Sequence, residues 1–115
     1  YTYTNLRNHL ASIEADPERN KYIRRKRLVL SNAGNECDLL WLTNFDAENA
    51  EIAARPVVAL SARVHPGESN ASWMMHGILH FLTSAAAEAV ALRQRLLFLI
   101  VPMLNPDGVV IRNYR

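Results

Sequence analysis

A histidine and a glutamate three residues apart, His65 and Glu68, are the side chains whose types and spacing could do chemistry. Imidazole nitrogens and carboxylate oxygens both bind zinc, and a His-x-x-Glu turn can place the two on one ion. Pro66 stiffens such a turn, and Gly67 permits backbone angles that other residues resist. The pair suits a metallohydrolase, although a catalytic zinc takes three protein ligands and only two are evident. The alternative is a solvated loop histidine beside a glutamate at a helix N-terminus.

Two apolar runs predict the strands that position this turn. Residues 57–64 directly precede it, and residues 96–104 form a similar run, so both read as strands buried on two faces. Helices between the two runs imply parallel strands joined by a right-handed crossover. The turn at residues 65–68 and a tight turn at residues 105–108 would then share one edge of the sheet, where α/β folds place their sites.

The rest of the pattern completes an α/β prediction, a mixed, mostly parallel sheet with helices on both faces. The other expected elements are a helix capped by Thr4 and ending near Ala15, a hairpin of strands at residues 28–30 and 37–43, a loop at 46–55, helices at about 70–83 and 85–95, and an extended segment from 109 to 111.

Composition sets further bounds. The 115 residues suit one small domain or part of a larger one, and 50% of them are hydrophobic, which favours a packed core over disorder. A net charge of +2 gives no argument for nucleic acid binding. The single cysteine, Cys37, excludes an intrachain disulfide, fits a reducing compartment and is expected in the core. No apolar run reaches the roughly 20 residues of a membrane span.

Several motifs, in order along nearly the whole chain, resemble the cytosolic carboxypeptidase family, which comprises zinc metallocarboxypeptidases of the carboxypeptidase A type. The motifs are YTYTNL at the start, GNECDLLWLTNF in the first half, HPGESNASW at the metal turn and VPMLNPDGV near the end. The resemblance implies an α/β sandwich around a mixed eight-stranded sheet, with His65 as the first zinc ligand and Glu68 as the second. The NPDG turn would be structural and lie beneath the active site.

The resemblance also implies a function. Members of this family remove C-terminal amino acids, especially glutamates from acidic protein tails such as those of tubulin. A similar activity here implies a Zn²⁺ cofactor, acidic protein tails as partners, no nucleic acid or membrane partner, and a cytoplasmic location.

Some of the family's pattern is not found in residues 1–115. Its third zinc ligand, its general-base glutamate and its asparagine–arginine pair for the substrate carboxylate are expected well beyond the NPDG turn. We therefore interpret residues 1–115 as the N-terminal portion of a catalytic domain, inactive and poorly folded by itself. Arg112 stands where glycine is usual, which puts the local turn in doubt. Arg115 is a candidate for polarising a substrate carbonyl.

Other candidates favour structural readings. Ser72, His76 and His80 are expected to form a solvated polar stripe on one helix, and His9 is expected at the surface. Core positions are expected for Trp73, Met74 and Phe81. The basic run at residues 21–27 is either a solvated approach to a strand or a segment that attracts polyglutamate.

Two rival functions stay open on the sequence. One is a non-catalytic, truncated domain that binds partners. The other is a zinc amidohydrolase, such as a deacylase, on the same scaffold.

Overall fold

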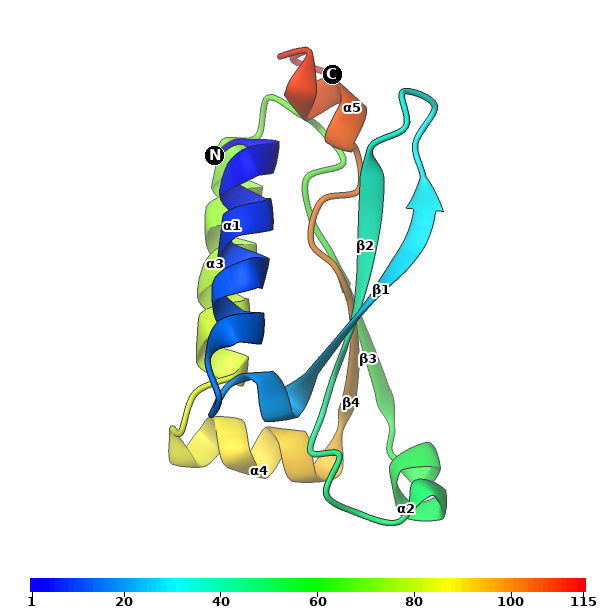
Figure 1. Ribbon diagram of the computed structural model, residues 1–115, viewed down its shortest axis with the longest axis vertical. Coiled ribbons are helices and arrows are strands. Elements are labelled where there is room, and N and C mark those ends of the chain that lie inside the picture. Colours follow the sequence, from blue (N-terminus) through cyan, green and yellow to red (C-terminus); the bar gives the residue numbers. More distant parts are fainter.

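The computed structural model describes residues 1–115, and its strands form one mixed sheet in the order β1-β2-β4-β3 (Figure 1). The strands are β1 (Ile23–Leu30), β2 (Glu36–Leu42), β3 (Val57–Ser61) and β4 (Leu97–Val101). β1 and β2 form the expected antiparallel hairpin, β2 and β4 are also antiparallel, and β3 and β4 are parallel. The mixed α/β fold is therefore confirmed, but the expectation of a mostly parallel sheet was wrong, because two of the three pairings are antiparallel and only the two strands that lead to the candidate site are parallel.

The helices are arranged around this sheet as Figure 1 shows, with α1 and α3 side by side along one face. They are α1 (Tyr3–Ala15), α2 (Asn49–Ala54), α3 (Ser69–Leu82), α4 (Ala87–Arg95) and α5 (Pro106–Val110), with a 3₁₀ turn at Asn20–Tyr22. No single helix is long and apolar enough to span a membrane. The consecutive helices α3 and α4 reach that length and composition only together, and the chain bends by 88° between them.

The core lies between the α1–α3 layer and the sheet. Alternate residues of β2 and β4 face the helices, because successive side chains of a strand point to opposite sides. Leu40 and Ile100, on neighbouring central strands, are fully buried there. Leu10 of α1 and Leu79 of α3 reach the same cluster with at most 1% of their surface exposed. The core thus fixes both helices against the two central strands.

The first helix begins earlier than expected. Thr2, not Thr4, is the N-cap: it has extended backbone angles, and its hydroxyl accepts a hydrogen bond from the Asn5 amide. The Asn5 side chain accepts from the Thr2 amide in return, which completes a capping box. Thr4 lies inside the first turn, where its side chain cannot cap.

Three expected elements were wrong in detail. Residues 46–55 contain the short helix α2 rather than a loop alone. The run at 57–64 is a strand only to Ser61 and is not buried on both faces, because β3 pairs with β4 alone and Val57 is 55% exposed. Residues 109–111 are not extended, because Asn105 caps α5 and Pro106 favours its first turn.

Asp107 in α5 fastens the tip of the β1–β2 hairpin. One carboxylate oxygen accepts from the Ser31 hydroxyl and the Asn35 amide group, and the other accepts from the Ala33 backbone. Hydrogen bonds from Ser31 and Asn35 lower the pKa of Asp107, so the carboxylate is the form that holds the hairpin.

We expect Asp107→Ala to lower the melting temperature by a few degrees, because three donors lose their acceptor. Amide exchange at Ala33 should also become faster. Asp46→Ala is the control, since that exposed side chain accepts no hydrogen bond. Unchanged exchange at Ala33 would show that the hairpin holds its shape without Asp107.

Candidate metal centre

The HPGE turn and the NPDG segment lie at the same edge of the sheet, as the parallel strands predicted. β3 leads into the first and β4 into the second. The Leu104 amide donates to the Ala62 carbonyl (2.8 Å), and the Asn105 amide donates to the Arg63 carbonyl (3.2 Å). The Asn105 side-chain amide also donates to the Val64 carbonyl (3.3 Å). The turn that carries His65 and Glu68 is therefore held by the NPDG segment.

Two glycines allow the segments to approach this closely. A Cβ at Gly108 would lie 2.7 Å from Pro66 Cγ, and a Cβ at Gly67 would lie 2.5 Å from Tyr114 Cδ2. The expected reason for Gly67 was wrong: its φ is not positive, and the approach of Tyr114 is what excludes a side chain. The Gly67 amide donates to the Tyr114 carbonyl (2.9 Å), which brings residue 115 beside the turn.

His65 and Glu68 have the donor atoms that zinc requires and no competing partner. Both residues are exposed, and neither side chain makes a hydrogen bond or ion pair within the chain. The Glu68 amide donates to the His65 carbonyl (3.1 Å), so both ligands belong to one tight turn. No three His, Cys, Asp or Glu side chains are placed to hold a metal ion together. The pair fits two of the three ligands of a zinc site, and both assignments stay predictions.

Arg63 is a buried residue of this turn that the sequence reasoning missed. It is 6% exposed and has a φ of +57°, in the left-handed region that side chains rarely adopt. Its guanidinium donates to the Pro66 carbonyl and to the Ser72 hydroxyl, and burial lowers its pKa. The one available signal was a charged residue interrupting the apolar run at residues 57–64.

The last residues of the chain lie against the turn. Arg112 has a φ of +60°, so the backbone here does use angles that favour glycine, as the usual glycine at this position implied. A hollow of about 290 Å³ is formed here by the HPGE turn, the chain's first residues and its last, and Arg63 and Arg112 contribute to its wall. No acidic side chain lines it.

Comparison with known proteins agrees with this geometry. The sequence profile of the zinc carboxypeptidase family matches residues 16–115. The chain belongs to the zinc carboxypeptidase family. It is 47% identical over all 115 residues to cytosolic carboxypeptidase 2 of Mus musculus and 44% identical to cytosolic carboxypeptidase 3 of Bos taurus. The matched region is the whole of this chain but only 13% and 11% of the length of those two relatives.

Solved structures show the zinc carboxypeptidase fold. A metallo-carboxypeptidase from Burkholderia cenocepacia superposes with a TM-score of 0.85 at 29% identity, over 100% of this chain and 30% of that one. Carboxypeptidase A of Helicoverpa armigera superposes with a TM-score of 0.80 at 21% identity, over 96% of this chain and 25% of that one, and shows the fold alone.

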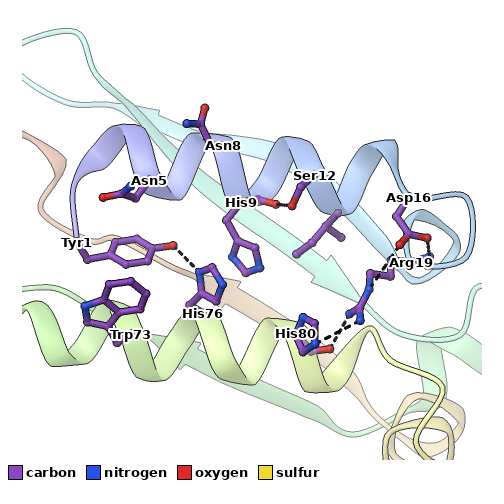
Figure 2. A pocket seen from close by; sticks show the side chains of 11 residues that line it. Tyr1, Asn5, Asn8, His9, Ser12, Asp16, Arg19, Trp73, His76 and His80 are labelled. Atoms are coloured by element: carbon purple, nitrogen blue, oxygen red, sulfur yellow. Dashed lines mark hydrogen bonds and ion pairs between the residues drawn. The ribbon is translucent and has the colours of Figure 1, made fainter.

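A second concave region of this zinc carboxypeptidase chain lies between α1 and α3, and Figure 2 shows it with His9 and His76 facing each other. Their rings stack with centroids 3.4 Å apart, and the Tyr1 hydroxyl is 3.0 Å from His76 Nδ1. The expected solvated stripe was wrong for Ser72, which is buried, and for His76, which packs against α1. His9 is likewise half-buried rather than a free surface residue.

The expected core positions on α3 were also wrong. Trp73, Met74 and Phe81 are 59%, 66% and 41% exposed, because α3 turns its other side to the core. Cys37 is buried, as expected.

The basic run at residues 21–27 is only partly paired with acidic side chains. Most of it lies in β1, where Arg25 pairs with Asp38 (2.9 Å) and Glu14 (2.8 Å). Arg24, Lys26 and Arg27 are exposed and form no ion pair, so attraction of polyglutamate by this run stays a prediction.

The stacked histidines predict a pH dependence of stability. Burial lowers the pKa of His9 from 6.5 to about 4, with further contributions from His76, His80 and Arg19. The unfolded chain therefore binds this proton more readily, and stability falls as the pH drops from above 6.5 to about 4. The full shift corresponds to ~3 kcal/mol. Screening of a partly exposed ring reduces the expected loss to about 1 kcal/mol.

We expect His9→Gln to remove this part of the pH dependence. Thermal unfolding at pH 7, 5.5 and 4 should show a smaller loss of stability in the variant than in the unmodified protein. Parallel curves for the two proteins would mean that His9 does not carry the effect.

Proposed function

We propose that this chain is the N-terminal portion of the catalytic domain of a metallocarboxypeptidase that removes C-terminal amino acids. The substrates we propose are acidic protein tails, with glutamate as the residue released and tubulin-like tails as the target. The observation that carries the proposal is the pairing of the exposed, unpartnered side chains of His65 and Glu68 in one turn at the carboxyl ends of parallel strands. The names of the cytosolic relatives support a cytoplasmic location.

The charge around the turn supports an acidic substrate. Arg112 and Arg115 are exposed at this end of the molecule, Arg112 lines the hollow next to the HPGE turn, and that hollow has no acidic side chain. Arginine side chains bind carboxylates through paired, charge-assisted hydrogen bonds. A tail rich in glutamates would therefore be attracted to this end of the molecule.

His65 and Glu68 would hold Zn²⁺ through an imidazole nitrogen and a carboxylate oxygen. A bound Zn²⁺ supplies an activated water and polarises the scissile carbonyl. We propose that Arg115 donates to that carbonyl oxygen and stabilises the negative charge that develops on it. The Gly67 amide donates to the carbonyl of Tyr114, the residue before Arg115, which supports this role. The third ligand and a glutamate that moves the proton would come from outside residues 1–115.

The test is release of single amino acids from defined peptides by the full-length protein. We expect loss of C-terminal glutamates by mass spectrometry, abolished by a chelator and restored by Zn²⁺. Peptides ending in lysine or alanine should be cleaved far more slowly. Cleavage of acylated amino acids, with peptides left intact, would instead support a deacylase. No zinc-dependent hydrolysis of any of these would support a partner-binding domain.

A further inference from the structure

Arg63 connects the metal turn to the helix that follows it. Its Nε and Nη2 atoms donate to the Pro66 carbonyl oxygen at 3.0 and 2.9 Å. Its Nη1 atom donates to the Ser72 hydroxyl of α3 at 2.7 Å. Pro66 lies between His65 and Glu68, so one rigid guanidinium holds the centre of the ligand turn against α3.

The backbone of Arg63 is held from the other side. Its carbonyl accepts from the Asn105 amide, which ties the same residue to the NPDG segment. Its positive φ of +57° costs energy in a residue with a side chain. Glycine would adopt this angle freely but would leave the buried Pro66 carbonyl without either donor. The hydrogen bonds that the Arg63 side chain donates to the Pro66 carbonyl therefore compensate for the strain in the Arg63 backbone.

The charge of Arg63 is also unusual for its surroundings. The side chain is 6% exposed, and no carboxylate lies within ion-pair distance of it. Buried arginines are normally paired with an acid. At Arg63 the neutral oxygens of the Pro66 carbonyl and the Ser72 hydroxyl accept its hydrogen bonds instead of a carboxylate. The fork of donors, rather than an ion pair, is what holds this side chain.

We propose that Arg63 is a positioning residue for the zinc site, which fixes the HPGE turn so that His65 and Glu68 face one metal ion. The inference rests on the proposed function, because it assumes that these two residues are ligands. Partners that orient ligands typically change metal affinity by about 10–100-fold when they are removed.

The test compares the Zn²⁺ affinity of the full-length protein, measured by competition with a chromophoric chelator, for three variants of Arg63 and one control variant. Arg63→Met removes the donors, Arg63→Lys keeps the charge without the fork, and Arg63→Gly removes the side chain while relieving the positive φ. We expect all three to bind Zn²⁺ about 10–100-fold more weakly and to alter the visible spectrum of the Co²⁺-substituted protein.

Arg55→Met is the matched control. Arg55 is also buried (8% exposed) and donates to the Thr43 hydroxyl and the Asn44 carbonyl, but it precedes β3 and lies at the opposite end of that strand. This variant should lose thermal stability in the metal-free protein and keep the unmodified Zn²⁺ affinity and Co²⁺ spectrum.

The outcomes separate the two proposals. Unmodified Zn²⁺ affinity in Arg63→Met or Arg63→Gly would overturn the role of Arg63 alone. An equal loss in Arg55→Met would also overturn it, since general destabilisation would then explain the effect. A full-length protein that binds no stoichiometric zinc before any substitution would contradict the proposed function, and the role of Arg63 with it.

Discussion

Full-length protein carrying His65→Ala or Glu68→Ala is expected to lose stoichiometric zinc and, with it, all measurable release of C-terminal residues. Each substitution removes one of the two exposed, unpartnered donors of the HPGE turn. A site with one fewer ligand should bind zinc more than ~100-fold more weakly, beyond the loss caused by changing a supporting residue. Elemental analysis after dialysis measures the metal, and mass spectrometry of a glutamate-ended peptide measures the activity.

The controls use the same residue types away from the turn. His80→Ala removes an exposed histidine of α3, and Glu88→Ala removes an acid from the first turn of α4. Both variants should keep zinc and activity. Because the two ligand side chains are exposed and make no hydrogen bond or ion pair within residues 1–115, their removal should leave the metal-free melting temperature unchanged. Zinc retained at one equivalent by both ligand variants would show that the metal is bound elsewhere.

Residues 1–115 produced alone are expected to show no carboxypeptidase activity and to associate in solution. No three metal-ligating side chains come together in this chain, so a bound ion would lack a ligand and a base. β3 leaves one edge unpaired, and the sheet face away from α1 and α3 leaves Trp41 and Val57 41% and 55% exposed. Open edges and apolar faces favour association between chains.

Size exclusion, binding of a hydrophobic dye and a peptide cleavage assay with added Zn²⁺ test this expectation. The matched control is a longer product that contains the whole catalytic domain, which should be monodisperse and active. Zinc-dependent release of glutamate by residues 1–115 would contradict the ligand count. A soluble monomer with a sharp thermal transition would instead favour a self-contained, partner-binding domain.

The sequence alone determined the pieces of the site whose signals are local. The apolar run ending before His65 and the run ending before Asn105 predicted two parallel strands, and parallel strands necessarily bring the two following turns to one edge. The first helix after the HPGE turn was expected at about residues 70–83 and lies at Ser69–Leu82. The family resemblance, rather than any local pattern, put the turn at Arg112 in doubt, and Arg112 has a φ of +60°.

Only the tertiary structure decided which faces are buried and what holds the turn. Trp73 and Met74 look like core residues, yet both are more than half exposed, and the Trp73 ring packs edge-to-face with Tyr1, whereas His9 and His76 look solvated and stack on each other between helices. Such burial depends on which distant segment packs alongside, and no local pattern encodes it. Arg63 was missed for a different reason: its acceptors, the Pro66 carbonyl and the Ser72 hydroxyl, are three and nine residues away along the chain, but only the folded turn and α3 bring them to one guanidinium.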